Sequence, residues 1–197
     1  QTSFAQKLIT AKELKTKKGV IIIDTRKASD YAKTHIKGAI NLESKSLEKP
    51  GTIKGLLKSP SQIATKLGAM GISRDSKIVL YCKTGTNAGR MYWILTYMGA
   101  KNVSILDGQM TAWRAVRGPL TKVKPTLKKT TFTPTVNKSV LATKAYVKSK
   151  QNSSSTIIVD ARKAEDFNAG KIAKSVNIPK EKLVTDKNNF KDKATLQ

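Results

Sequence analysis

The sequence is poor in the residues from which disulfides, metal centres and acid–base sites are built. Among its 197 residues there is one cysteine and one histidine. A single cysteine cannot form an internal disulfide, so cysteine usage does not identify the redox compartment. The sequence has no cluster of metal ligands, no nucleotide-binding loop and no Ser/His/Asp arrangement, and we expect neither a metal nor another cofactor. Uninterrupted apolar runs are short, and none approaches the length of a membrane span.

Acidic residues are scarce as well. The chain has 13 Asp and Glu against 38 Lys and Arg, which gives a formal net charge of +25. Such a charge suggests an anionic partner, which could be nucleic acid, an anionic surface or a small anionic substrate. The lysines are spread through every segment, without interleaved aromatic residues or a groove-reading motif. We therefore favour a solvated basic surface and do not expect nucleic-acid binding.

The chain also lacks an initiator Met and begins with Gln1. We therefore expect that an upstream segment was removed, either a secretory signal peptide or an expression tag. The basic composition and the Gln start together favour a periplasmic or secreted protein, with a cytoplasmic protein as the alternative.

Short apolar runs that alternate with helical patterns define the fold class. Val20–Asp24 is a continuous, mostly β-branched run, which is typical of a buried strand in a parallel sheet. Further strands are expected at Ile36–Leu42, Lys77–Tyr81 and Val103–Leu106, and helices at Ala11–Lys18, Ala28–Thr34, Pro60–Leu67, Ala88–Tyr97 and after Asp107-Gly108. The alternation predicts an α/β fold with a central, mostly parallel sheet flanked by helices.

The one cysteine, Cys82, lies where a predicted strand runs into a polar turn, residues 82–87, that opens a helix. Backbone N–H groups at such a turn favour negative charge, because they have no partner within the helix and the helix dipole adds to their effect. The turn therefore favours the thiolate, which is the nucleophilic form of cysteine. A buried structural cysteine is the alternative, but it would be expected inside the strand rather than at its end. We interpret Cys82 as a nucleophile.

The sequence contains an internal repeat. Asp24–Tyr31 aligns without a gap with Asp160–Phe167, which lies 136 residues further on, and this period indicates two copies of one domain. Residues 119–138 between the copies carry Pro, Lys and Thr with few large apolar residues, as is typical of a linker. We therefore predict a first domain at residues 1–118, a linker, and an incomplete second domain at residues 139–197.

The second copy is shorter than the first. The position 136 residues after Cys82 would be 218, beyond the last residue, Gln197. A fragment with about two strands cannot bury a sheet by itself. We therefore expect the chain to be a piece of a longer tandem protein, in which a completed second domain packs against the first near the Cys82 loop.

Four motifs in a fixed order resemble the rhodanese family of sulfurtransferases. They are Asp24-x-Arg26, His35-Ile36-x-Gly38-Ala39-x-Asn41, Cys82-x-x-Gly85, and Leu106-Asp107-Gly108 followed by Trp113. The resemblance covers residues 8–116 and, as a partial second copy, residues 139 to about 180. It implies a rhodanese-like fold of the tandem-domain type. In the well-known two-domain members the reactive cysteine lies in the second copy, whereas here the first copy carries one.

By this resemblance Cys82 carries the sulfur, and the five following residues form a cradle whose amides converge on it. These residues are Lys83, Thr84, Gly85, Thr86 and Asn87. Gly85 suits a position that requires a positive φ and no side chain above the sulfur. Many single-domain relatives end this loop with Arg and two-domain enzymes often end it with Thr, so the uncharged Asn87 leaves the substrate preference open. Asp30 stands where two-domain thiosulfate enzymes have an Arg, which makes Lys83 the remaining candidate for contact with an anionic donor.

Residues of two of these four motifs are expected to support the structure. We expect Asp24 and Arg26 to form a buried or half-buried ion pair that fixes the loop architecture rather than contacting substrate. His35, the sole histidine, is expected to pack at a turn rather than to act as a base, and its counterpart in the second copy is Lys171.

The resemblance implies an enzyme that moves sulfane sulfur from a small anionic donor, such as thiosulfate, to a thiol or cyanide through a Cys82 persulfide. A non-enzymatic persulfide carrier or binding module that delivers sulfur to a partner protein is the alternative. A phosphatase or arsenate reductase would need a longer Cys-x5-Arg loop to clamp its oxyanion. Ala88 stands six residues after Cys82, and Arg90 comes two residues too late, which argues against that class.

Overall fold

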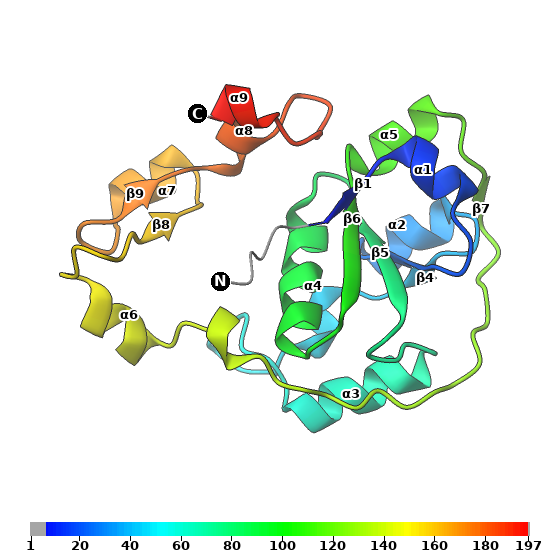
Figure 1. Cartoon of the computed structure of the whole chain (residues 1–197), viewed down its shortest axis with the longest axis horizontal. Helices are drawn as coiled ribbons and strands as arrows, with labels where there is room; N and C mark the ends of the chain where they lie inside the picture. The colour runs from blue at the N-terminus through cyan, green and yellow to red at the C-terminus, as the bar shows by residue number, and fades with distance from the viewer. Residues whose placement is uncertain (1–6, 197) are drawn as a thin grey trace. The chain divides into compact units, whose positions relative to one another are not determined.

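The computed structural model describes residues 7–196, which divide into two compact units with the boundary between Val140 and Leu141 (Figure 1). Each unit is described by itself. Within residues 7–196, no helix combines the length and the apolar composition that crossing a membrane requires.

The first unit is built on a five-stranded sheet with the order β1-β6-β5-β2-β4. Its strands are β1 (Leu8–Ile9), β2 (Ile21–Asp24), β4 (Ile40–Asn41), β5 (Lys77–Tyr81) and β6 (Asn102–Leu106). All four pairings are parallel, so the carboxyl ends of these strands lie at one edge. β5 is the middle strand, and its last four residues are buried, as expected for a strand covered on both faces. The predicted α/β fold with a mostly parallel sheet is confirmed.

Helices cover both faces of this sheet. They are α1 (Ala11–Thr16), α2 (Ala28–Lys33), α3 (Pro60–Ala69), α4 (Thr86–Tyr97) and α5 (Gln109–Ala115). Two apolar clusters fill the space between sheet and helices. One contains residues of α3 and α4, including Leu67 and Ile94, and the other contains residues of α1 and α5, including Leu14 and Trp113. Thr10 and Ser59 begin α1 and α3 with capping boxes, in which each side chain accepts the backbone N–H three residues later.

Short elements complete the first unit. They are β3 (His35–Ile36), the 3-10 helix η1 (Ser44–Leu47), β7 (Leu120–Thr121) and the 3-10 helix η2 (Lys138–Val140). β3 and β7 form a separate antiparallel pair, with His35 opposite Thr121.

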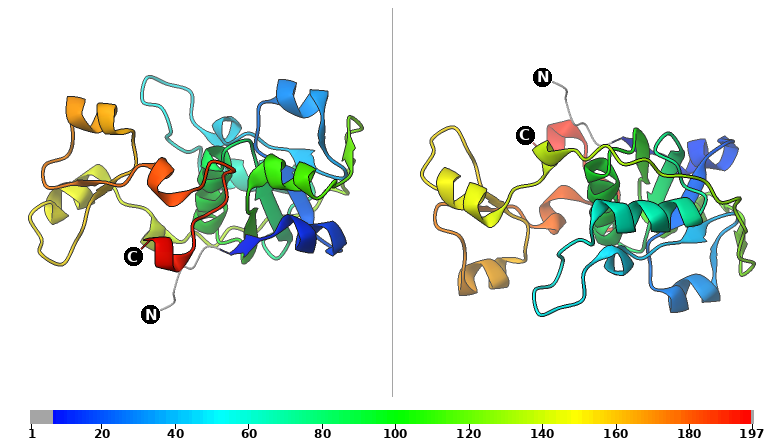
Figure 2. Two further views of the ribbon diagram at one scale, coloured as in Figure 1. Left: turned by 90° about the horizontal axis from the view of Figure 1, so that it is seen from above. Right: turned by 90° about the horizontal axis from the view of Figure 1, so that it is seen from below.

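Residues 119–138 lie along the first unit, and they pass α3 in Figure 1 and in the right-hand view of Figure 2. The Thr130 N–H donates to the Gly68 carbonyl at 2.9 Å, and the Asn137 N–H donates to the Tyr97 carbonyl at 2.8 Å. Phe132 is buried in the same cluster as α3 and α4. Apart from β7 and η2 the segment has no regular secondary structure, yet it is held by backbone hydrogen bonds and a buried aromatic ring.

The second unit contains α6 (Lys144–Lys150), β8 (Val159–Asp160), α7 (Ala164–Ala169), β9 (Val176–Asn177), α8 (Lys180–Leu183) and α9 (Lys193–Leu196). β8 and β9 pair in parallel, with Val159 opposite Val176. This register matches that of β2 and β4, in which Ile23 lies opposite Ile40.

The apolar side chains of the second unit are not covered. Val159 is 50% exposed and Ile172 is 46% exposed, whereas the residues 136 positions earlier, Ile23 and Ile36, are fully buried. Among the side chains whose burial is described between positions 141 and 196, none is buried. The two-stranded sheet of this unit therefore has no apolar core of its own.

We predict that Gly68→Ala lowers the free energy of unfolding by roughly 1–3 kcal/mol. A Cβ at Gly68 would lie 2.5 Å from the Thr130 carbonyl oxygen, so the segment at Thr130 would have to move. Gly89→Ala is the matched control in α4, because a Cβ there meets nothing within 4 Å; it should raise stability by up to about 1 kcal/mol. Urea unfolding measures both, and equal effects of the two variants would contradict the close packing of residues 119–138.

We predict that amide hydrogen exchange differs sharply between the two units. The amides of β5 lie in a buried central strand and should exchange slowly, whereas those of β8 and β9 should exchange at rates close to those of an unstructured peptide. Mass-spectrometric exchange on the intact chain measures both in one sample. Protection of β8 equal to that of β5 would show that the second unit is stable as it stands.

Candidate active site

Cys82 directly follows β5, at the carboxyl end of the middle strand of the sheet, as predicted. The turn that follows ends at Gly85, and α4 begins at Thr86. Gly85 has φ +91°, a left-handed conformation that strongly favours glycine. A Cβ at Gly85 would make only an ordinary contact, 3.8 Å from the Gln109 amide nitrogen. Backbone conformation, rather than lack of space, therefore requires glycine here.

Cys82 is buried, with 2% of the residue exposed. The Gly85 N–H donates to Cys82 Sγ, with 3.0 Å between nitrogen and sulfur. A backbone donor directed at the sulfur stabilises negative charge on it. Behind the thiol, the Cys82 N–H donates to the side-chain oxygen of Gln109 at 2.9 Å.

The five residues after Cys82 have different surroundings. Lys83, Thr86 and Asn87 are exposed, whereas Thr84 and Gly85 are partly buried. Thr86 and Asn87 also line a cavity of about 530 Å³, together with residues from the loop after β2, from η1 and from α4: Thr25, Lys27, Glu43, Ser44, Lys45, Glu48 and Arg90. Lys83, predicted as a contact for an anionic donor, is not among the lining residues of this cavity.

Arg90 is held by residues other than the cysteine turn. Its Nη2 donates to the Gly55 carbonyl at 2.6 Å and lies 3.7 Å from Glu48 Oε1. Its guanidinium also lies 4.7 Å from the ring centre of Trp93. An oxyanion clamp of the phosphatase kind needs a guanidinium directed into the turn, and these contacts direct Arg90 elsewhere.

Asp24 and Arg26 form a buried ion pair beside the turn. Arg26 Nε lies 2.9 and 3.0 Å from the two Asp24 oxygens, and Nη2 donates to the Thr34 carbonyl at 2.7 Å. The Asp24 side chain is fully buried and that of Arg26 is 11% exposed. Burial opposes the charge on Arg26, but the hydrogen bonds and charge of Asp24 outweigh it, so the pKa of Arg26 is raised.

Tyr81, the last residue of β5, completes this group. Its hydroxyl donates to Asp24 Oδ2 at 2.6 Å and accepts the Ile36 N–H at 3.1 Å. Burial raises the pKa of Tyr81 well above its ordinary value, and the neighbouring Asp24 charge adds to the effect. The phenol therefore stays protonated and remains a donor. The sequence motifs did not indicate a role for Tyr81, and the only signal was its position immediately before Cys82.

The second unit repeats the ion pair in an exposed setting. Arg162 Nε lies 3.0 and 3.1 Å from the Asp160 oxygens, and Nη2 donates to the Gly170 carbonyl at 2.6 Å. Asn177 donates to the carbonyls of Asp160 and Arg162, as Asn41 does to those of Asp24 and Arg26. The Arg162 side chain, however, is 50% exposed.

His35 is fully buried, and its ring contacts Tyr31 and Val123, which lie outside the cysteine turn. Its Nδ1 lies 2.8 Å from the Tyr31 carbonyl and its Nε2 lies 3.0 Å from the Val123 carbonyl, while its ring stacks on Tyr31. Both ring nitrogens are therefore engaged by backbone oxygens. This arrangement fits the predicted packing role and leaves no ring nitrogen directed at Cys82.

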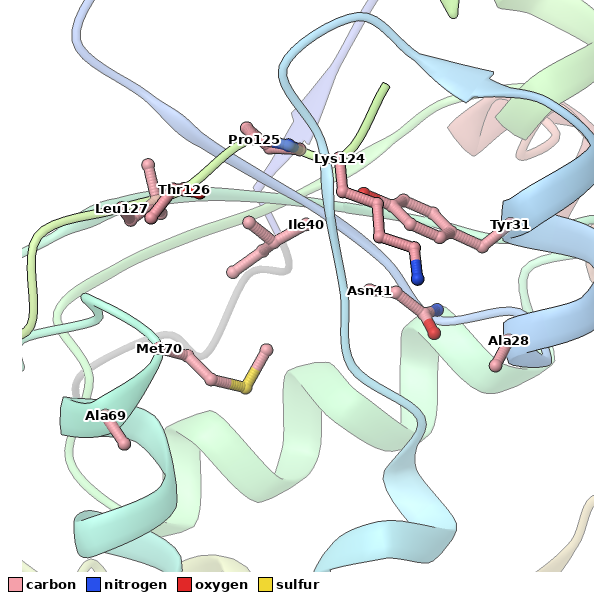
Figure 3. Close-up of a pocket in the computed structure, with 10 residues that line it drawn as sticks. All are labelled: Ala28, Tyr31, Ile40, Asn41, Ala69, Met70, Lys124, Pro125, Thr126 and Leu127. Carbon is pink, nitrogen blue, oxygen red and sulfur yellow. The ribbon is translucent and has the colours of Figure 1, made fainter. Parts of the chain in front are cut away.

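A second cavity, of about 410 Å³, lies between α2, the end of α3 and residues 124–127 (Figure 3). Tyr31, Asn41, Met70 and Lys124 are among its lining residues. Neither Cys82 nor any residue of its turn lines this cavity, so it is not part of the candidate site.

Comparison with known proteins identifies the family. The model of the rhodanese-like domain matches residues 8–116 and 143–196, and the chain belongs to this family. It is 30% identical over 178 residues to a Pseudomonas aeruginosa protein named "Probable 3-mercaptopyruvate sulfurtransferase", covering 81% of this chain and 63% of that protein. It is 27% identical over 181 residues to the Bos taurus thiosulfate sulfurtransferase, covering 82% of this chain and 60% of the relative. The chain thus spans about three fifths of the length of these relatives.

The fold is shared with a solved structure of the same class. The crystal structure of Escherichia coli SseA, described as a rhodanese fold of 3-mercaptopyruvate sulfurtransferases, superimposes with a TM-score of 0.88. The match covers 96% of this chain and 80% of that one, at 24% identity. This likeness establishes the rhodanese fold.

We predict that Arg26→Ala lowers the free energy of unfolding of the first unit by roughly 3–5 kcal/mol, because it leaves the buried Asp24 carboxylate without its cation. Arg162→Ala removes the same pair where it is exposed and should leave the unfolding of the first unit unchanged. Urea unfolding followed by tryptophan fluorescence measures the first unit, where both tryptophans lie. Equal, small effects of the two variants would contradict a supporting role for the buried pair.

Proposed function

We propose that the chain supplies a sulfurtransferase site in which Cys82 is the nucleophile. The Cys82 thiolate attacks the outer sulfur of a donor such as thiosulfate, an S–S bond forms at Cys82, and sulfite leaves with the electron pair of the broken bond. A thiol or cyanide then attacks the outer sulfur of the Cys82 persulfide. The S–S bond breaks, its electron pair returns to Cys82, and the thiolate is restored.

One observation carries this proposal: the Gly85 N–H donates to the sulfur of a cysteine that directly follows the middle strand of the sheet. The names of the relatives, thiosulfate and 3-mercaptopyruvate sulfurtransferases, support the same chemistry. In the proposed site the amides of Lys83, Thr84, Gly85, Thr86 and Asn87 receive the outer sulfur and its charge. Asp24 and Arg26 hold the turn in place without contacting substrate.

We propose that a small anionic donor approaches through the cavity beside Thr86 and Asn87. Lys27 and Lys45 line it, and among the described residues neither is in an ion pair. Thiosulfate and mercaptopyruvate are both small anions, so either suits such an entrance. Lys83 lies exposed beside Cys82 and is the nearest further cation in the sequence.

The domain organisation also remains a proposal. We propose a tandem arrangement in which residues 1–118 form the domain with the reactive cysteine and residues 139–197 form part of a second rhodanese-like domain. The repeated Asp–Arg–Asn hydrogen bonds and the exposed apolar face of β8 and β9 support this arrangement. We also propose, on the basic composition, a periplasmic or secreted location, with a cytoplasmic one as the alternative; cell fractionation distinguishes them.

We predict that incubation with thiosulfate or mercaptopyruvate adds the mass of one sulfur atom to the intact chain, and that Cys82→Ser abolishes both this addition and turnover to thiocyanate. A serine hydroxyl is not ionised near neutral pH and cannot hold sulfane sulfur. His35→Ala, which changes a buried group away from the turn, should lower the melting temperature but retain the addition. Sulfur addition without turnover would identify the alternative, a persulfide carrier, and addition to Cys82→Ser would contradict the site.

A further inference from the structure

Gln109 occupies a conformation that its side chain disfavours. Its φ is +55°, directly after Gly108 at φ +69°. The left-handed region is uncommon for residues with a Cβ, and a glutamine gains nothing there from its own backbone. Such a conformation persists only where surrounding contacts enforce it, and it is a reason to look for a role.

The Gln109 side chain is fully buried and both ends of its amide are engaged. Its oxygen accepts the Cys82 N–H at 2.9 Å, and its nitrogen donates to the Leu106 carbonyl at 2.7 Å. Cys82 follows β5 and Leu106 ends β6, so the amide bridges the carboxyl ends of two neighbouring strands. A buried amide needs such partners, and here one of them is the backbone of the reactive residue itself.

The backbone of Cys82 is held on both sides by the start of α5. Besides the Gln109 bond at its N–H, its carbonyl accepts the Met110 N–H at 3.4 Å. With the backbone fixed, Sγ is limited to the few positions that the χ1 rotamers of Cys82 allow, and in the observed one it accepts the Gly85 N–H. The Gln109 nitrogen also lies close beneath the turn, 3.8 Å from where a Gly85 Cβ would be.

We propose that Gln109 is a positioning residue: its buried amide holds the Cys82 backbone so that the sulfur stays on the Gly85 N–H, which favours the thiolate. The inference deepens the proposed sulfur transfer and rests on Cys82 being the reacting thiol. The left-handed backbone of Gln109 costs conformational strain, and the hydrogen bond from the Cys82 N–H to its side-chain oxygen requires that conformation in this structure.

Three variants separate positioning from stability. Gln109→Gly removes the amide and relieves the φ strain, Gln109→Ala removes the amide and keeps the strain, and Arg117→Gly is the matched control. Arg117 has φ +49° just beyond the other end of α5 and is exposed, so glycine there relieves a similar strain without touching Cys82. For each variant we would measure the melting temperature, the iodoacetamide alkylation rate of Cys82 from pH 5 to 10, and the amide NMR shifts of Cys82 and Gly85.

We expect Gln109→Gly to melt above Gln109→Ala, while both alkylate about fivefold more slowly than the parent at neutral pH, the ratio that one hydrogen bond typically provides. The Cys82 and Gly85 amide shifts should move in both. Arg117→Gly should keep the parent alkylation profile. A parent-like profile in Gln109→Gly would overturn the proposal and leave Gln109 a purely structural bridge.

A second arm covers a failure of Gln109→Gly to fold. Gln109→Met keeps the length of the side chain but removes both the acceptor for the Cys82 N–H and the donor to the Leu106 carbonyl; a parent-like alkylation profile and parent-like amide shifts in this variant would also overturn the proposal. Alkylation requires no sulfur donor. A parent chain that gains no sulfur from either thiosulfate or mercaptopyruvate, but whose alkylation profile shifts in Gln109→Gly, would refute the proposed function and support the positioning role.

Discussion

The first unit depends on one buried charge, the Asp24 carboxylate. A carboxylate without solvent is costly unless hydrogen bonds and an opposite charge surround it. Here Arg26 supplies the charge and three donors, its backbone N–H, Nε and Nη2, and the Tyr81 hydroxyl supplies another. Because Tyr81 also accepts the Ile36 N–H, the carboxylate ties together β2, β3 and the end of β5. Cys82 is the next residue after Tyr81, so the contacts that hold Tyr81 also position the start of the cysteine turn.

The internal repeat separates what the local sequence encodes from what the fold adds. Asp160, Arg162 and Asn177 reproduce the hydrogen bonds of Asp24, Arg26 and Asn41 in a unit whose described side chains are not buried. The motif therefore forms through contacts among the loops around one short strand pair. Burial of the charge comes only with further strands: in the first unit β5 lies beside β2 and brings Tyr81 over the carboxylate.

The features predicted from sequence are those that short stretches determine. The apolar run before Asp24 predicted a strand, and the glycine-containing turn after Cys82 predicted the strand-to-helix connection at the site. The family match supports the resemblance drawn from those motifs. Gln109 escaped prediction because its role depends on a positive φ and on a contact with a residue 27 positions earlier. The preceding residues, Leu106-Asp107-Gly108, form one of the motifs of the resemblance. The one local indication of Gln109 is a long polar side chain at a turn position with a left-handed backbone.

Residues 119–138 show that amino-acid composition does not distinguish a free linker from a segment packed on a surface. Proline, lysine and threonine are typical of a free linker, and they are equally compatible with an extended segment packed on a surface. What decides between the two lies elsewhere in the chain, at Gly68 and Gly99, where a Cβ would lie 2.5 and 2.3 Å from the carbonyls of Thr130 and Thr135. Gly68 within α3 and Gly99 after α4 thus leave room for the backbone of residues 119–138. The contacts join residues far apart in the sequence, so local composition does not predict them.

Net charge is a poor guide to the site for a similar reason. The chain carries +25 overall, yet the cavity beside the cysteine turn holds Glu43 and Glu48 as well as its cations. Glu43 accepts the Ala28 N–H and Glu48 lies near Arg90, so both carboxylates serve the framework. Because charges a Debye length away are screened, the electrostatic potential at the cavity depends mainly on the charges that line it, among them Lys27 and Lys45. The charge at this cavity therefore depends on which carboxylates the framework pairs locally, here Glu43 with the Ala28 N–H and Glu48 with Arg90, rather than on the abundance of lysine in the chain.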